Sequence, residues 1–198
     1  MSKMEISQYG DNDAVTREEL HFRRIDVRGW RRSDGLYEVE GRVIDQKPEV
    51  YKSPNGCKVV PVGEPIHDMG VKLVFDEDML VHSVSAFTAS APFDDCFAAG
   101  QSLQAIKGLR IAGGWSSEVR QRLGGAQSCT HLIGILIPMG TVAYQSLTKV
   151  RYSRPQKVNA KGVPVKVDSC YAYAANRELV MRKWPSSYTG LVVDITQK

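Results

Sequence analysis

The stretch MGVKLVFDEDMLVHSVSAF, residues 69–87, decides the fold of this chain. Its two runs rich in β-branched and aromatic residues, 69–75 and 79–87, flank the acidic turn Asp76-Glu77-Asp78. Runs of this length with a polar turn between them are typical of an antiparallel β-hairpin. The sequence therefore predicts two adjacent strands in the middle of the chain, and the other elements can be placed around them.

A second hairpin precedes this one. Residues 20–45 alternate imperfectly between apolar and polar side chains and contain the turn Ser33-Asp34-Gly35, which divides them into two strands. Gly41 falls where the alternation slips and marks a candidate bulge. The segment 47–64 is rich in proline and glycine, so we expect a long loop there, with a lid as one interpretation.

The second half of the chain changes to helical spacing. Apolar residues recur at helical intervals within 97–107, 115–123 and 130–147, which predicts three helices. Pro138 should kink or interrupt the last and longest of them. After a basic, loop-like stretch, residues 165–173 and 178–182 predict a final hairpin, or a strand followed by a short helix.

These elements predict an α+β fold, in which an antiparallel β-sheet from the N-terminal half is packed by helices from the C-terminal half. The chain has 198 residues, of which 42% are hydrophobic and 24% charged. Such values suit one soluble globular domain with a sizeable core. We expect residues 1–18 to form a loose leader and residues 19–198 to form a single α+β metal-binding domain.

The net charge of +4 is small and dispersed, so no nucleic acid is expected as a partner. The densest basic run, 23–32, is interpreted as a solvated strand face, with an anion pocket as the alternative. No apolar stretch approaches the roughly 20 residues that span a bilayer, and the N-terminus lacks the apolar centre of a signal peptide. We therefore expect a cytoplasmic protein, without a membrane partner, whose four cysteines are thiols or metal ligands.

Four side chains have the chemistry of a single zinc site: His67, Cys96, Cys129 and His131. Thiolate and imidazole are preferred protein ligands of zinc, and four of them complete a tetrahedral shell. His67 precedes one strand of the central hairpin and Cys96 follows the other, so the two are expected to lie close together. Cys129 and His131 stand at the start of the longest predicted helix, where the helix dipole favours a thiolate.

Taken singly, a cysteine is more often a small buried apolar residue than a ligand, so the metal prediction rests on these positions. Asp68 is the candidate catalytic residue, as a general base on bound water, an exchangeable ligand or a partner of a histidine; a turn aspartate is the structural alternative. Cys170 is an alternative to one of the four ligands. The predicted substrate pocket is basic and aromatic and consists of Arg28, Trp30 and Tyr144.

Several segments between Phe22 and Tyr188 carry a family resemblance: RRSDGLYEVEG (31–41), IHDM (66–69), Pro92 with Cys96, RQRLGGAQSCTHL (120–132), AYQ (143–145) and DSC (168–170). Through them the chain resembles a bacterial family catalogued as domain of unknown function 2889. The resemblance implies an accessory or catabolic protein of the kind that soil bacteria use in aromatic or acyl-CoA degradation. Members of this family often have a histidine after the cysteine equivalent to Cys170, where this chain has Tyr171.

The chain is also distantly similar to the iron–sulfur scaffold fold of the NifU and IscU type. That fold has a small antiparallel sheet followed by helices, with ligands at a strand start, after the hairpin and at a late helix start. Here His67-Asp68, Cys96 and Cys129 occur in that order. The scaffold family has a cysteine where this chain has His67, and this difference favours stably bound zinc over a transient cluster.

We therefore expect a small zinc-dependent enzyme, of lyase or hydrolase type, that acts on an aromatic carbonyl compound in aromatic catabolism. Iron or an iron–sulfur cluster is the less favoured cofactor. One alternative is a non-catalytic metal-binding accessory subunit of a larger complex, such as an aromatic-ketone carboxylase. The other is a metallochaperone or an iron–sulfur scaffold. The expected partner is thus a small aromatic substrate or a catabolic enzyme complex, and a homo-oligomer is compatible with either.

Overall fold

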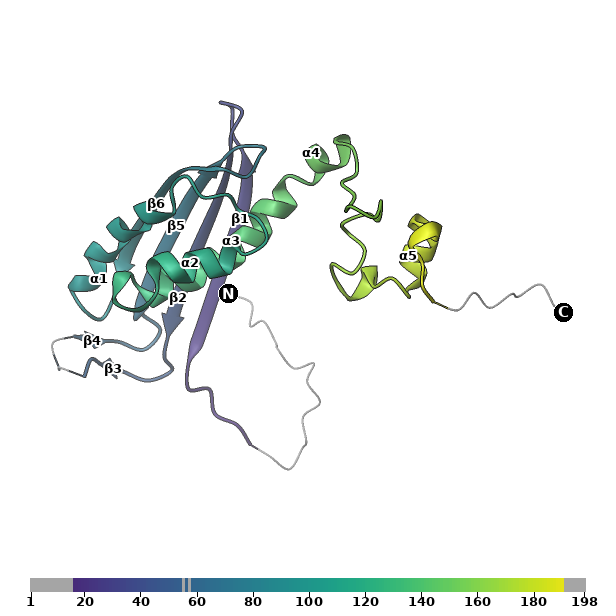
Figure 1. Ribbon diagram of the computed structural model, residues 1–198. Helices are drawn as coiled ribbons and strands as arrows, with labels where there is room; N and C mark the ends of the chain where they lie inside the picture. The colour runs from purple at the N-terminus through teal and green to yellow at the C-terminus, as the bar shows by residue number, and fades with distance from the viewer. Residues whose placement is uncertain (1–15, 55, 57, 191–198) are drawn as a thin grey trace. The chain divides into compact units, whose positions relative to one another are not determined.

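The computed structural model describes residues 16–54, 56 and 58–190. Its central feature is a four-stranded sheet with the strand order β1-β2-β5-β6 (Figure 1). The strands are β1 (Phe22–Arg31), β2 (Tyr37–Gln46), β5 (His67–Phe75) and β6 (Val81–Ser90). All three neighbouring pairs are antiparallel. Both predicted hairpins are therefore confirmed, and the pairing of β2 with β5 joins them into one sheet.

The segment between β2 and β5 contains a small hairpin where the sequence predicted only a loop. Its strands are β3 (Tyr51–Lys52) and β4 (Val59–Val60), which pair antiparallel. The Lys58 backbone N–H donates to Ser53 Oγ at 3.0 Å, and the Ser53 N–H donates to the Lys58 carbonyl at 2.9 Å. Strands of two residues are too short to give a signal of alternating hydrophobicity, so the sequence did not reveal them.

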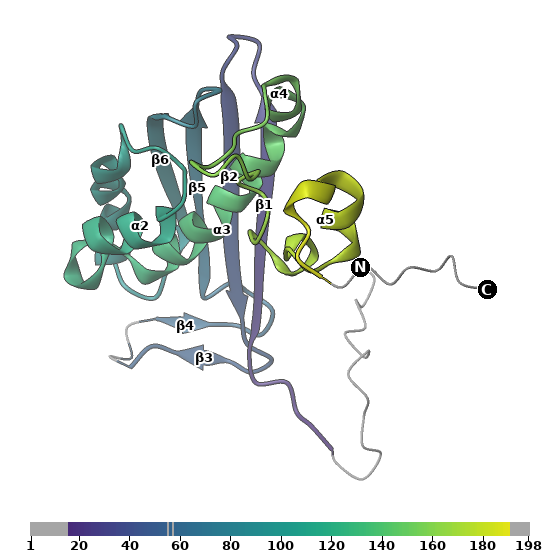
Figure 2. The ribbon, with the colours of Figure 1, turned by 45° about the vertical axis from the view of Figure 1, so that its right-hand side comes forward.

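The sheet has one covered face and one open face, because side chains alternate between the two sides of a strand. Every second residue of β2, from Tyr37 to Asp45, is buried, and the residues between them are less so. The helices α2 (Trp115–Leu123) and α3 (Thr130–Ser146) lie on one side of the sheet (Figure 2). We call the side packed by α3 the covered face and the other side the open face.

Gly41 permits a close contact between helix and sheet. A Cβ atom at this position would lie 2.2 Å from Cγ2 of Ile135 and 2.9 Å from Sδ of Met139, both on α3. The pairing of β2 runs through Gly41 without a shift on either side. The expected bulge at Gly41 is therefore wrong, and the register shifts lie instead between β5 and β6, at Asp68/Met69 and Val74/Phe75.

Helix α3 supplies most of the cover of the sheet. Its predicted apolar stripe is fully buried and consists of Leu132, Ile135, Leu136, Met139 and Ala143. Pro138 lies inside the continuous helix, so the predicted interruption is wrong. Proline removes one backbone hydrogen bond, but the buried side chains before and after it hold both halves of α3 against the sheet.

Short helical turns connect β6 to the long helices. The sequence predicted one helix over 97–107, and the structure has one turn of α-helix, α1 (Asp95–Ala98), followed by the 3₁₀ helix η1 (Ala99–Ile106). A further 3₁₀ turn, η2 (Gly125–Gln127), leads into α3. Leu103 and Ile106 of η1 are fully buried. The predicted helix at 115–123 is confirmed as α2.

The packing divides the chain into two compact units, the first ending at Leu147 and the second beginning at Thr148. The second unit has α4 (Thr148–Ser153), η3 (Tyr171–Tyr173), α5 (Glu178–Lys183) and η4 (Pro185–Ser187). The predicted short helix is confirmed as α5, but the strand at 165–173 is wrong. Residues 165–168 form a turn, in which Asp168 has a φ of 61° and accepts a hydrogen bond from the Ala175 N–H at 2.8 Å.

The α+β class is confirmed, with the sheet in the N-terminal half and helices in the C-terminal half. Residues 1–15 of the expected leader lie outside the described residues. The domain predicted over 19–198 spans both compact units. Among the described residues, no helix combines the length and the apolar character needed to cross a membrane.

Candidate metal centre

Two histidine rings from distant parts of the chain stack on the covered face of the sheet. His67 is the first residue of β5, and His131 lies in the first turn of α3. Their ring centroids are 3.8 Å apart, and their planes differ by 29°. They meet because α3 begins over the end of the sheet at which β5 starts. This pair is the centre of the candidate site.

Asp45 completes a cluster with the two histidines. It stands directly opposite His67 in the register of β2 and β5, and its side chain is 1% exposed. Asp45 Oδ2 lies 3.1 Å from His67 Nδ1 and 3.6 Å from His131 Nε2. One ligand atom from each of the three residues lies within 4.8 Å of the other two. Within the described part of the chain, this is the group of side chains compact enough to hold a metal ion.

Arg23 keeps the Asp45 carboxylate ionised. The two residues are cross-strand partners on β1 and β2, and Arg23 donates from Nε and Nη2 to the two carboxylate oxygens at 2.6 and 2.7 Å. Burial alone would raise the pKa of Asp45, but the hydrogen bonds and charge of Arg23, with a contact from His21 at 3.3 Å, outweigh it and lower the pKa. Asp45 therefore carries a full negative charge at neutral pH.

Both histidines of the cluster are neutral at the same pH. Burial, followed by the charge of His131, lowers the pKa of His67 to about 4, against the opposing effect of Asp45. Burial, followed by the positive charge of Arg23, lowers the pKa of His131 as well. A neutral imidazole has one ring nitrogen with a free lone pair. The site therefore presents two imidazole lone pairs and one carboxylate.

The buried Nδ1 atom of His67 lacks a hydrogen-bond partner among the described residues. It lies only 3.1 Å from Asp45 Oδ2, but the two groups are not oriented to form a hydrogen bond. A buried polar atom without a partner costs free energy, and in a native structure it often marks a place for an ion or a water molecule. This atom faces the Asp45 carboxylate, beside His131.

The three residues fit a zinc ion. Zinc binds imidazole nitrogen and carboxylate oxygen at about 2.0–2.2 Å, which places the ligand atoms about 3.3 Å apart in a tetrahedral shell. The distances from Asp45 Oδ2 to the two histidine nitrogens, 3.1 and 3.6 Å, bracket this value. The side chains of His67 and His131 are 15% and 22% exposed, so both histidines are partly accessible to solvent.

The predicted thiol ligands lie beside this cluster but not within it. Cys129 precedes α3, and its Sγ is 3.7 Å from Nδ1 of His131, the ring nitrogen that does not face Asp45. Cys96 lies in α1, and its pKa is raised by burial and then by the neighbouring Cys129. Of the four predicted ligands, the structure therefore brings His67 and His131 together and places Cys129 next to His131. That Cys96 and Cys129 bind a metal remains a prediction.

Asp45 was missed by the sequence reasoning, although a signal for it existed. Tyr37, Val39 and Val43 are the inward-facing residues of β2, and the same period of two places Asp45 on the covered face. A carboxylate at an inward position is costly unless a partner neutralises it. Arg23 and His67, its neighbours on the two flanking strands, supply that partner.

Asp68, the predicted catalytic residue, points to the open face. It follows His67 on β5, so the two side chains leave the strand on opposite sides. Arg42 donates from Nε and Nη2 to the two Asp68 oxygens at 2.6 and 2.5 Å. The carboxylate is therefore held in an ion pair away from the histidines. Its role as a base stays a prediction.

The predicted substrate pocket is divided by the sheet. Arg28 and Trp30 line a hollow on the open face, whereas Tyr144 belongs to α3, which packs on the covered face. The structure therefore does not bring the three residues into one pocket with the histidines. Cys170, the alternative ligand, is exposed and belongs to the second compact unit.

Comparison with known proteins gives one match. A family model described as "Protein of unknown function (DUF2889)" matches residues 21–145, which is more than half of the chain and includes the whole candidate site. No curated protein and no solved structure matches the chain, so the likeness to the NifU and IscU fold stays a prediction. The match over the sheet, α2 and nearly all of α3 shows that the chain belongs to the DUF2889 family.

Proposed function

We propose that this protein binds one zinc ion through His67, His131 and Asp45, and that it is a metal-dependent enzyme acting on a carbonyl compound. One observation carries the proposal: the buried Nδ1 of His67 has no hydrogen-bond partner among the described residues and faces an ionised carboxylate. A neutral second imidazole, His131, is stacked against it. Two imidazoles and one carboxylate make a donor set that catalytic zinc sites use.

The number of ligands and their exposure support an enzyme over a structural site. Three protein ligands leave the fourth position of a tetrahedral shell for water or a substrate oxygen, where zinc supplies Lewis-acid chemistry. Solvent reaches the histidines, since neither is fully buried. Arg23 holds Asp45 in place through both oxygens, while its own side chain is 46% exposed. Its guanidinium is therefore placed to orient a substrate oxygen next to the site.

The substrate class in this proposal is an aromatic carbonyl compound, and the reaction is a hydrolysis or a lyase reaction. The aromatic character follows from the family resemblance and not from the geometry of the cluster. Asp68 has no part in the proposal, because its carboxylate lies on the opposite face of the sheet in an ion pair with Arg42. Arg28 and Trp30 also have no part in the proposed zinc site, because they lie on the open face of the sheet.

A second candidate function is a metal-binding accessory subunit without its own catalysis. The contact between Cys129 Sγ and His131 Nδ1, at 3.7 Å, supports it. If His131 bound the metal through Nδ1, then Cys129 and Cys96 would join the two histidines in a shell of four protein ligands. Closed shells of this kind are typical of structural zinc sites. The two candidates therefore differ in the third and fourth ligands.

Zinc content tests the proposal directly. We expect the full chain, purified without added metal, to contain one zinc ion per molecule. Inductively coupled plasma mass spectrometry measures this content. His67→Gln and His131→Gln should each lose it, whereas His82→Gln should retain it. His82 is a matched control because it is exposed and pairs with Asp76 at 2.9 Å, away from the cluster. If His131→Gln has the same thermal unfolding as the wild type and still contains one zinc ion, the proposed site is wrong.

Cobalt substitution separates the two candidates. Thiolate ligands give Co²⁺ a strong near-ultraviolet charge-transfer absorption, which nitrogen and carboxylate ligands do not. The proposal predicts that this absorption is absent and that Asp45→Asn weakens binding of the metal. A strong absorption that Cys129→Ser abolishes would favour the closed shell. The zinc-loaded enzyme should also hydrolyse an aromatic ester such as 4-nitrophenyl acetate faster than the metal-free protein, and equal rates would favour the accessory subunit.

A further inference from the structure

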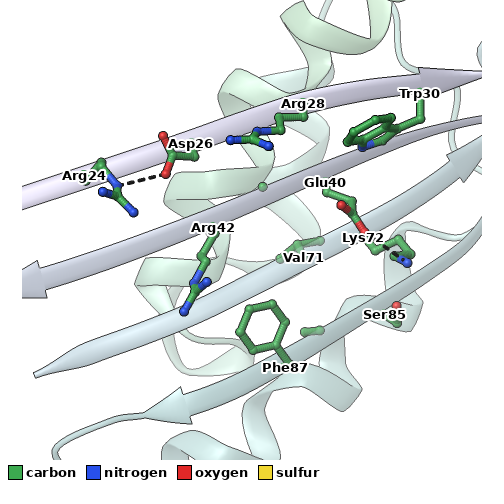
Figure 3. Close-up of a pocket in the computed structure, with 12 residues that line it drawn as sticks. Arg24, Asp26, Arg28, Trp30, Glu40, Arg42, Val71, Lys72, Ser85 and Phe87 are labelled. Atoms are coloured by element: carbon green, nitrogen blue, oxygen red, sulfur yellow. Dashed lines mark ion pairs between the residues drawn. The ribbon is translucent and has the colours of Figure 1, made fainter. Parts of the chain in front are cut away.

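The open face of the sheet has a hollow with a volume of about 550 Å³. Residues from all four strands line it, and Figure 3 shows the side chains of Arg28, Trp30 and Phe87 on the side of the sheet away from the helices. The volume lies within the range of about 300–1,000 Å³ that small-molecule sites occupy. The sheet separates this hollow from the candidate metal centre, because Asp45 and His67 point to the covered face.

Most charges around the hollow are neutralised by neighbours. Arg24 pairs with Asp26 at 2.9 Å, and Lys72 pairs with Glu40 at 3.1 Å. Arg42 is held by Asp68, outside the lining. Ion pairs of this kind are common on strand faces that contact solvent, and on their own they do not indicate a ligand.

Arg28 is the exception. It stands directly opposite Glu40 in the register of β1 and β2, yet Glu40 pairs with Lys72 on the far side. Among the described residues Arg28 has no ion pair, hydrogen bond or ring contact. Its guanidinium therefore points over the hollow with its donors unused by the protein (Figure 3).

Two aromatic rings border the same hollow. Trp30 follows Arg28 by two residues on β1, so both side chains leave the same face, and Trp30 is 48% exposed. Phe87 on β6 is 50% exposed, with the Arg42 guanidinium 5.8 Å from its ring centroid. Large exposed rings that border a concave surface often mark a ligand site.

We propose that this hollow binds a small planar aromatic carboxylate, with the carboxylate on Arg28 and the aromatic ring stacked on Trp30. A guanidinium binds a carboxylate through two parallel hydrogen bonds, and an indole offers the largest flat surface for stacking. A single charge suits the site better than a polyanion, because one unpaired cation stands among carboxylates such as Asp26 and Glu40. This site is independent of the proposed metal chemistry, which lies on the other face.

Calorimetric titration of the full chain with 2-naphthoate tests this site. The wild-type protein should bind one molecule, and Arg28→Gln should weaken binding at least about tenfold, as expected when charge-assisted hydrogen bonds are lost. Arg28→Lys should fall between the two. The neutral analogue naphthalene-2-carboxamide should bind the wild type as weakly as 2-naphthoate binds Arg28→Gln. Trp30→Ala should also bind 2-naphthoate more weakly than the wild type.

Arg31→Gln is the matched control. This substitution removes the same charge from the same strand, but Arg31 points to the other face of β1. The affinity of Arg31→Gln for 2-naphthoate should therefore stay within about twofold of that of the wild type. Removal of metal with a chelator should leave binding unchanged. Equal affinity of the wild type and Arg28→Gln, or no binding of 2-naphthoate by the wild type, would overturn the proposal. So would tighter binding of a short oligothymidylate than of 2-naphthoate, lost in Arg28→Gln, because the occupant would then be a single-stranded nucleic acid.

Discussion

Arg23 and Asp45 face each other across β1 and β2, and the guanidinium of Arg23 binds both oxygens of the Asp45 carboxylate. The pair is unequal, because the side chain of Asp45 is 1% exposed and that of Arg23 is 46% exposed. A buried carboxylate is thus anchored by a cation that stays in contact with water. This arrangement fixes the orientation of the carboxylate toward the two histidines.

Asp45→Asn should lower the free energy of unfolding by about 1–3 kcal/mol, less than the loss of a fully buried ion pair because Arg23 is half exposed. Urea denaturation of the metal-free protein measures the change. Asp26→Asn is the control, since Asp26 and its partner Arg24 are both about half exposed and their pair should contribute about 0–1 kcal/mol. Equal effects of the two substitutions would contradict the anchoring role of Arg23.

The stability of the metal-free protein should fall as the pH is lowered from 6.5 toward about 4. The pKa of His67 drops from 6.5 to about 4 on folding, so in this window the unfolded chain binds a proton that the folded protein does not. His131 acts in the same direction, because its pKa is also lowered. Above pH 6.5 neither group contributes. The lowered pKa of Asp45 adds a further loss only at more acidic pH.

Urea midpoints between neutral pH and about pH 4 measure this dependence. His67→Gln removes the group that titrates, so its stability should change less over the same interval. His82→Gln, at an exposed position, should keep the slope of the wild type. A slope in His67→Gln as steep as that of the wild type would show that His67 is not the titrating group.

Zinc binding should release well under one proton at about pH 6.5, where water on zinc stays largely protonated. His67, with a pKa of about 4, and Asp45 have no proton to lose there. Cys96 has a pKa raised above its ordinary value, so a shell that includes its thiolate must release a proton. Calorimetry in two buffers with different ionisation enthalpies counts the protons. Release of one proton or more would favour thiolate ligation.

Gly41→Ala should destabilise the protein by about 1–3 kcal/mol, the usual cost of excess volume in a packed contact. The added Cβ would lie 2.2 Å from Ile135 and force α3 away from β2. Because α3 carries His131, zinc affinity should fall as well. Gly134→Ala is the control: a Cβ there meets nothing within 4 Å, and alanine in a helix is favoured over glycine by up to about 1 kcal/mol. Thermal unfolding and zinc titration of both variants measure the difference.

The sheet and the long helices could be predicted from the sequence because their signals are local. The runs on either side of Asp76-Glu77-Asp78 are long enough and rich enough in β-branched and aromatic residues to define two strands, and the apolar stripe of α3 repeats along the helix. The strands β3 and β4 have two residues each and leave no such pattern. The tail at 165–173 has strand-like residues, but no neighbouring strand pairs with it there among the described residues.

The candidate site was predicted only in part, because it depends on which side chains face each other across the sheet. His67 and His131 were found through their chemistry and their positions at the ends of elements. The phase of β2 indicates that Asp45 faces inward, but its pairing with Arg23 and His67 cannot be predicted from a single strand. Asp68 was predicted at the same site as its neighbour His67, which requires an irregular strand start, but both lie within β5 and their side chains leave it on opposite sides.

Strand β1 contributes to both sides of the sheet, with Arg23 toward the candidate metal centre and Arg28 toward the hollow on the open face. It also stands at the end of the strand order and pairs with β2 alone within the sheet. A slip of β1 by a single residue would turn both arginines to the wrong side at once. An insertion or deletion of one residue between Arg23 and Arg28 would instead place both side chains on the same face, so it should abolish one of the two proposed sites and spare the other.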